Sequence, residues 1–325
     1  MDINVFLPHE LDTVMRVLRT ALNPQGALDP DERTFLDTYA RVAGRDPLRA
    51  DPPPIAPEGV VVTGPHRRKR LVQLSALAVL LARPVRPQSM AFLKQLAVRL
   101  GTHDAVIDVI DALSKGRHLQ VRLLAMRRVM RVLLKEAYLA EGLMGVLRVF
   151  AAMWLKAPVN KNRLWNYKRL GLLPEGTLGR EYWSFMTREG FGFPGDVAGI
   201  PASISYHDVA HVLAGHGATP LGEVQQACFQ TGSRREDGFF FVQMAILHFH
   251  QGVKVTPATD AVTGQFRPDL ALWAIHRGAQ CNVDVTHQWN YWPLMTLPLE
   301  EARARVSLLP KLGDPPPWSA LRTAA

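Results

Sequence analysis

Apolar residues recur every three or four positions from residue 8 to residue 139, and the alternating pattern of a strand is nearly absent. This spacing places the apolar side chains on one face of an α-helix. Six segments show it: residues 8–22, 29–44, 68–82, 87–101, 103–114 and 118–139. Asp29-Pro30 and Pro87 are typical helix starts, and Gly44, Gly101 and Gly116 are typical helix ends. We predict an all-α protein, and 325 residues with 47% hydrophobic content are enough for two domains.

Four polar residues in the second half form the pattern H-D-x2-H-x11-E: His207, Asp208, His211 and Glu223. At about 100° per residue, the two histidines lie roughly 40° apart on a helix, and Asp208 widens the arc to about 100°. The glycines and proline of residues 215–222 should end this helix and return Glu223 at the start of another. Histidines four apart are also common as hydrogen-bonded core residues. The added carboxylates favour a site for one divalent metal ion, with zinc first and iron or manganese as alternatives.

Several segments around this pattern resemble the family of coenzyme Q (ubiquinone) biosynthesis proteins that form the fourth component of that pathway. The matching segments are residues 167–186, 207–211, 221–223, 229–232 and 283–308, so the resemblance covers about residues 160–310. It implies an all-helical fold, a zinc-type site with the four polar residues as ligands, and a cavity for a polyprenyl tail. It also implies a role in replacing the C1 carboxyl group of a quinone precursor by hydroxyl.

In this interpretation His207, His211 and Glu223 hold the ion, which keeps an open position for water or for an aromatic acid. Asp208 is either a fourth ligand or the group that takes a proton. Asp208 and Glu223 are therefore the candidate catalytic residues. The protein would be a metal-dependent oxidative decarboxylase or lyase of prenyl-quinone biosynthesis, or a lipid-binding scaffold for that pathway.

Three further residues are candidates for substrate binding: Arg180, Tyr182 and Tyr206. Arg180 has two interpretations, because it can bind a substrate carboxylate in a bidentate way or form an ion pair with Glu181. The expected substrate is a prenylated aromatic acid or another isoprenoid lipid.

Two functions from other classes stay open. A metal-dependent phosphohydrolase of the H…HD…D type also uses an adjacent His-Asp pair, although it needs an upstream His and a distant downstream Asp. Alternatively, the metal only holds helices together and the protein is a non-catalytic lipid-binding or interaction protein.

The N-terminal part resembles the TerB-like helical domains of tellurite resistance over about residues 8–138. The resemblance rests on the turn at residues 23–32 and on a weak repeat, in which Phe35-Leu36 followed by Gly44 matches Phe92-Leu93 followed by Gly101. We predict a TerB-like helical domain at residues 1–138, acting as a docking or packing module. A metal-binding helical domain of coenzyme Q biosynthesis type follows at residues 139–325.

Charge is uneven along the chain. Residues 1–135 contain 21 Lys and Arg against 13 Asp and Glu, whereas the remainder contains 17 against 16. A solvated helix face explains such a basic row, and attraction to anionic lipid head groups or to an acidic partner is the alternative. Because no aromatic residues interleave the basic ones, we expect no nucleic-acid partner.

The remaining features concern the compartment. Cys228 and Cys281 have no C-x2-C partner, which indicates buried free thiols in a reducing compartment. The first residues lack the pattern of an export signal, and the apolar stretch from Leu143 to Leu155 is too short to cross a bilayer. We predict a cytoplasmic protein, either free or peripheral on the inner face of the cytoplasmic membrane. Other quinone-biosynthesis enzymes and further copies of the chain are the expected protein partners.

Overall fold

Every regular element in the described part of the chain is a helix. The computed structural model describes residues 1–154, 160–196, 199, 204–256, 259–287 and 289–311, and within them only isolated β-bridges connect extended residues. This confirms the all-α prediction. The α-helices are α1 (Leu11–Leu22), α2 (Pro30–Val42), α3 (Pro65–Leu81), α4 (Pro87–Arg99), α5 (Val106–Ser114), α6 (His118–Trp154), α7 (Lys161–Lys168), α8 (Leu178–Arg188), α9 (Tyr206–Ala214), α10 (Pro220–Ser233), α11 (Phe239–Phe249), α12 (Pro268–Gln280) and α13 (Leu299–Arg305). Short 3-10 helices are η1 (Pro8–Glu10), η2 (Pro57–Gly59), η3 (Arg169–Leu172) and η5 (Trp292–Leu294).

The six helical segments predicted from periodicity correspond to α1–α6. Helix α2 shows how local sequence sets a start, since the Asp29 carboxylate accepts from the Glu32 backbone N–H at 2.9 Å. The Glu32 carboxylate accepts from the Asp29 N–H at 2.9 Å, which completes a capping box with Pro30 as the first helical residue. The glycines predicted as stops follow α2, α4 and α5 with positive φ: Gly44, Gly101 and Gly116.

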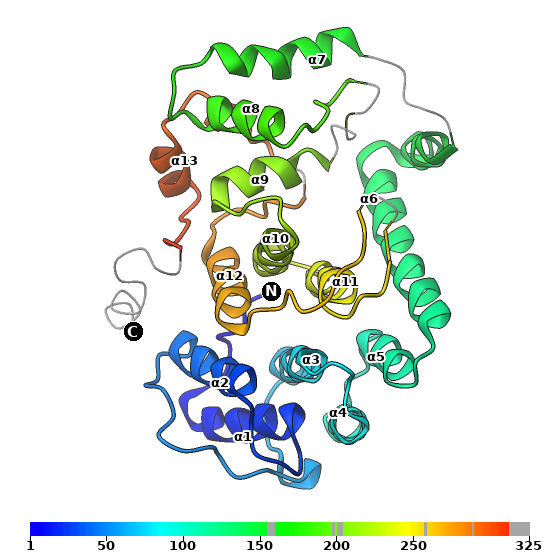
Figure 1. Ribbon diagram of the computed structural model, residues 1–325, viewed down its shortest axis with the longest axis vertical. Helices are drawn as coiled ribbons and strands as arrows, with labels where there is room; N and C mark the ends of the chain where they lie inside the picture. Colours follow the sequence, from blue (N-terminus) through cyan, green and yellow to red (C-terminus); the bar gives the residue numbers. More distant parts are fainter. Residues whose placement is uncertain (155–159, 197–198, 200–203, 257–258, 288, 312–325) are drawn as a thin grey trace.

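The helices form an elongated arrangement in which α10, α11 and α12 occupy the centre. In Figure 1, α1–α5 lie at the lower end, α7–α9 lie at the upper end, and α6 runs along one side. Helix α10 packs against α11 and α12, and α12 in turn packs against α2. The centre therefore connects the N-terminal helices to the part of the chain that carries the H-D-x2-H-x11-E pattern.

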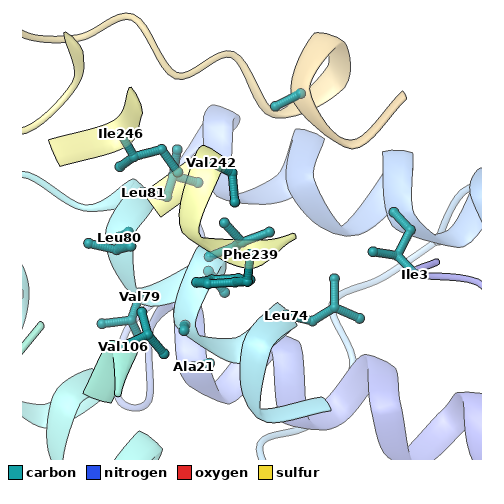
Figure 2. Close-up of a cluster of buried hydrophobic side chains, with 14 of the residues drawn as sticks. Ile3, Ala21, Leu74, Val79, Leu80, Leu81, Val106, Phe239, Val242 and Ile246 are labelled. Atoms are coloured by element: carbon teal, nitrogen blue, oxygen red, sulfur yellow. The ribbon is translucent and has the colours of Figure 1, made fainter. Parts of the chain in front are cut away.

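One hydrophobic core extends from the N-terminal helices into this centre. In Figure 2, Phe239, Val242 and Ile246 of α11 lie among Leu80 and Leu81 of α3. All five are buried members of the same hydrophobic cluster. The domain boundary predicted at residue 138 falls inside α6. Separate domains at residues 1–138 and 139–325 stay a prediction.

Close backbone contact fixes α10 against α12. A Cβ atom on Gly232 would lie 2.0 Å from the carbonyl oxygen of Ile275, and one on Gly278 would lie 2.0 Å from the carbonyl oxygen of Phe229. Only glycine allows the two helix backbones to approach so closely at these positions. Because α10 carries Glu223, this contact also determines where that carboxylate lies.

The cysteines and the lengths of the apolar helices can be compared with the sequence predictions. Both cysteines are buried free thiols, as predicted. No helix within the described residues is long and apolar enough to cross a membrane. The last residue of the apolar stretch, Leu155, lies outside the described residues.

Candidate metal centre

A helix, a tight connection and a second helix position the polar side chains of the pattern. His207 and His211 lie one turn apart on α9, which ends at Gly215 with φ of 72°. The His216 N–H then donates to the His211 carbonyl at 2.9 Å. The side chain of Thr219 accepts from the Gly222 N–H at 3.2 Å and caps α10. Helix α10 therefore starts beside the end of α9, and Glu223 lies in its first turn.

Gly222 makes this tight connection sterically feasible. A Cβ atom at this position would lie 2.0 Å from the carbonyl oxygen of Gly217. A Cβ atom on Gly217, by contrast, would have no other atom within 4 Å. The return of the chain from α9 to α10, and hence the position of Glu223, depends on the missing side chain of Gly222.

The ligand atoms of His207, His211 and Glu223 converge. The two Nε2 atoms lie 3.2 Å apart. Glu223 Oε2 lies 3.5 Å from His207 Nε2, and Oε1 lies 3.4 Å from His211 Nε2. A tetrahedral ion bound at zinc–ligand distances separates its ligand atoms by about 3.3–3.4 Å. These pairwise separations are close to that value, with each histidine facing a different oxygen of Glu223. The three side chains therefore form a group that could hold a divalent metal ion.

The outer nitrogen of each imidazole is held by an acceptor. His207 Nδ1 donates to Gln230 Oε1 at 3.0 Å, and His211 Nδ1 donates to the His216 carbonyl at 3.3 Å. A neutral imidazole that donates through Nδ1 carries its lone pair on Nε2. Two lone pairs and a carboxylate therefore face one point. Such a set needs a cation or extra protons between its members.

The pKa values of Glu223 and His207 depend on their neighbours in this group. Burial raises the pKa of the Glu223 carboxyl. When His207 and His211 carry protons on Nε2, their hydrogen bonds to Glu223 outweigh burial and hold that pKa well below its ordinary value. Burial lowers the pKa of His207, and the hydrogen bond and charge of Glu223 outweigh it, so the net shift is upward. The trio attracts positive charge, which is the property that a cation site requires.

The candidate site is covered on one side and open on the other. The His211 side chain is only 1% exposed, whereas the side chains of His207 and Glu223 are 36% and 24% exposed. The Phe185 ring stacks on His211 with centroids 5.6 Å apart and covers the buried side. A ligand can therefore reach the convergence point from the side of His207 and Glu223.

Asp208 lies outside the group of converging ligand atoms. It is buried and follows His207 on α9. Burial raises the pKa of its carboxyl, against the opposing effect of the two histidines. After burial, the charge of Asp208 is the next largest cause that raises the pKa of Tyr182. Of the four predicted ligands, the structure brings three together, and Asp208 lies outside that group.

The three candidate substrate-binding residues have different surroundings. Tyr182 on α8 is fully buried, and its hydroxyl has no hydrogen-bond partner among the described residues. Tyr206 is half-buried at the start of α9, directly before His207. Arg180 donates to the Gly171 carbonyl and lies over the Trp183 ring, 5.0 Å from its centroid.

The ion pair proposed between Arg180 and Glu181 is replaced by separate contacts. Glu181 Oε1 accepts from the Gly176 N–H at 3.2 Å, while Arg180 binds the Gly171 carbonyl. Both residues brace the connection from η3 into α8. The physical reason is that Gly171 lies in the short helix η3 and Gly176 in the turn before α8, where main-chain groups need partners outside a regular helix.

Two sets of polar residues beside the trio had no predicted role. Tyr167, Ser205 and Tyr291 form a buried ring of hydroxyls, with separations of 3.1, 2.6 and 2.5 Å. Gln226 and Gln230 lie on the same face of α10 as Glu223. Their spacing of three and seven residues after Glu223 is a helical polar stripe, and this signal is present in the sequence. The hydroxyl ring has no such signal, because its members are distant along the chain.

No family model and no curated protein sequence matches this chain.

Proposed function

We propose that the protein binds one divalent metal ion, zinc in first place, through His207, His211 and Glu223. We further propose that it acts there on a prenylated aromatic acid in a pathway of coenzyme Q type. The observation that carries the proposal is the convergence of the three side chains. The two Nε2 atoms lie 3.2 Å apart, and each lies 3.4–3.5 Å from one oxygen of Glu223. The sequence resemblance over residues 160–310 supports the substrate class. The same resemblance supports conversion of the C1 carboxyl group to hydroxyl.

The chain's own residues provide a charged entrance and a buried proton site. His207 and Glu223 lie at the open side, where the head group of an aromatic acid can approach. When bound, the metal ion supplies Lewis-acid stabilisation of negative charge on the ring oxygens. Burial raises the pKa of the Asp208 carboxyl, and in this proposal Asp208 is the residue that exchanges a proton. The free hydroxyl of Tyr182 lies in the electrostatic field of Asp208 and offers a hydrogen bond to a ligand.

Electron balance limits the reaction. Replacing a C1 carboxylate by hydroxyl releases carbon dioxide and removes two electrons from the aromatic substrate. Zinc has no redox chemistry. Dioxygen or another component of the pathway must therefore accept these electrons. Iron or manganese at the site could relay them to that acceptor but would not replace it.

The position of Asp208 bears on the phosphohydrolase alternative. That class binds metal through an adjacent His-Asp pair, so it would need Asp208 at the convergence point. In the structure Glu223 lies there, and Asp208 is outside the group. The geometry favours a His-His-Glu site.

Metal analysis combined with lipid analysis tests the proposal. The full chain is purified without added metal, and its metal content is measured by mass spectrometry together with any lipid in an organic extract. We expect about one divalent ion per chain and a co-purifying prenylated aromatic acid. Glu223→Gln should lose the ion. His9→Gln, which changes an exposed histidine on η1, should retain it.

Each other outcome excludes a part of the proposal. Equal metal content in the wild type and in Glu223→Gln would exclude the trio as the site. Hydrolysis of a phosphate ester that requires Glu223 would replace the quinone pathway by the phosphohydrolase function. A folded Glu223→Gln protein that binds prenyl lipid and retains full activity in cells would identify a non-catalytic scaffold.

A further inference from the structure

Helix α6 carries an exposed apolar stripe that no described element covers. Leu119, Leu123 and Met126 are 70%, 62% and 44% exposed. At about 100° per residue they lie within an arc of about 60° on the helix surface. Single exposed apolar side chains are common on protein surfaces. Three of them in one line on one helix form a continuous apolar strip.

The opposite face of the same helix segment is the one that packs on the protein. Val121 and Ala125 are fully buried, and α6 contacts α5 and α11. Arg128 on this inner face donates to Gln243 Oε1 at 2.6 Å and lies 3.8 Å from Asp104 Oδ1. The first turns of α6 are thus anchored to the protein, and the apolar stripe points away from the anchor. Figure 1 shows α6 along the side of the molecule.

Basic side chains flank the stripe on both sides. Arg122 and Arg127 are exposed, and helical geometry places them about 60° and 80° from the stripe's first residue, in opposite directions. Between Lys115 and Lys135 the chain has seven basic residues and no Asp or Glu. A shallow hollow of about 520 Å³ adjoins the stripe and is lined by residues 116–120 and 123.

From this arrangement we propose that the first half of α6 is a docking surface for an anionic lipid bilayer. The helix lies in the plane of the membrane interface, with the leucines and the methionine inserted among the acyl chains. Arg122 and Arg127 extend to the phosphate groups on either side, as long basic side chains do at such interfaces. This inference is independent of the metal site, because none of its residues belongs to α9 or α10.

Charge complementarity selects this occupant. A second copy of the chain on the same face would bring two sets of arginines together with no acid from this segment to pair with them. An acidic protein would satisfy the arginines, but it would leave the apolar strip needing a matching apolar partner. An anionic bilayer offers both negative head groups and apolar interior in one surface.

Co-sedimentation with vesicles tests the docking surface. The full chain is mixed with vesicles of phosphatidylcholine, with and without phosphatidylglycerol, at low and high NaCl. We expect binding only to vesicles that contain phosphatidylglycerol, and release as salt rises. Arg122→Gln/Arg127→Gln should weaken binding by about thirtyfold. Leu119→Gln/Leu123→Gln should weaken it at least as much, since the inserted apolar area is lost.

Matched control variants separate this surface from general effects. Arg49→Gln/Arg305→Gln removes two exposed basic residues elsewhere, and Val98→Gln changes a side chain that is 83% exposed on α4. These controls should bind vesicles like the wild type. Thermal unfolding should be unchanged in all variants, because every altered side chain is exposed.

Specific results would overturn the inference. Equal binding to neutral and anionic vesicles, or no binding at all, would reject it, as would binding that both α6 variants retain. Binding to polyglutamate with unchanged affinity after Leu119→Gln/Leu123→Gln would identify an acidic protein partner instead. A concentration-dependent dimer that the leucine variant abolishes, without vesicle binding by the wild type, would identify an interface between copies.

Discussion

Gln230 Oε1 lies 3.0 Å from His207 Nδ1, and both residues belong to helices that meet at the candidate metal centre. Gln230 follows Glu223 by seven residues on α10, so one helix supplies both a converging carboxylate and the acceptor that orients an imidazole. This relationship fixes the His207 tautomer with its lone pair on Nε2.

Loss of this acceptor should weaken metal binding. In Gln230→Leu the His207 ring loses its orienting hydrogen bond, and we expect zinc affinity to fall by about 10–100-fold. Affinity is measured by competition with a chromophoric chelator. Gln226→Leu is the matched control, because it removes another buried glutamine of α10 that binds His216 at 3.1 Å instead of one of the two converging histidines. If both variants lost affinity equally, the effect would come from helix packing.

Gly222→Ala should disturb the connection between α9 and α10. The new methyl group would meet the Gly217 carbonyl, so the start of α10 must shift. We expect a loss of about 1–3 kcal/mol in unfolding free energy, together with weaker zinc binding because Glu223 moves. Gly217→Ala places its methyl group in open space and should cost much less. Denaturant titration and the chelator assay measure the two effects, and equal costs would refute the steric argument.

Stability should fall as the pH drops below the ordinary pKa of histidine. Burial and the charge of Arg277 lower the pKa of His216 to about 3. In the unfolded chain the His216 imidazole takes up a proton as the pH falls below about 6.5, whereas in the folded chain it stays neutral down to about pH 3. The free energy of unfolding is therefore highest above pH 6.5 and decreases between pH 6.5 and pH 3. At pH 5 the decrease is about 2 kcal/mol of unfolding free energy relative to pH 7.

His216→Gln isolates this effect. The variant removes the titrating ring, so its stability should change less between pH 7 and pH 5 than that of the wild type. His250 is also buried with a pKa lowered to about 4, but it is present in both proteins and cancels in the comparison. Unfolding is measured with a chelator present at both pH values. Parallel pH profiles of the two proteins would disprove the role of His216.

The buried tyrosines should respond differently to loss of their hydroxyls. Tyr291→Phe breaks hydrogen bonds with Tyr167 and Ser205, and we expect it to cost about 1–3 kcal/mol. Tyr182→Phe removes a hydroxyl that has no partner among the described residues, so stability should stay equal or increase. Thermal and denaturant unfolding provide the comparison. A large loss in Tyr182→Phe would show that its hydroxyl has an internal partner in solution.

Local signals in the sequence predicted much of the helical architecture. The capping box at Asp29 and Glu32 and the glycine stop at Gly101 act within a few residues, so their effects are visible without tertiary structure. The spacing of His207 and His211 likewise predicted a common helix face, and the turn before Glu223 predicted its return. These inferences hold because hydrogen bonds within a helix depend on neighbours three or four residues away.

Other features arise from contacts between distant segments. The sequence pattern left Asp208 either as a fourth ligand or as a group that takes a proton, and in the structure it lies outside the converging trio. The domain boundary predicted at residue 138 falls inside α6, and the division into two domains stays a prediction. Amino-acid composition does not specify which hydrophobic helix faces pack against one another.

The amino-acid sequence alone determined that this chain is helical, where most N-terminal helices begin and end, and which polar side chains share a helical face. Packing decided which of those side chains meet at one point and which acceptors hold them. It also decided which face of α6 stays uncovered. The physical reason is that periodicity and capping act over one or two turns. Convergence at the candidate metal centre instead depends on the close approach of Gly217 and Gly222 and on the packing of α10 against α12.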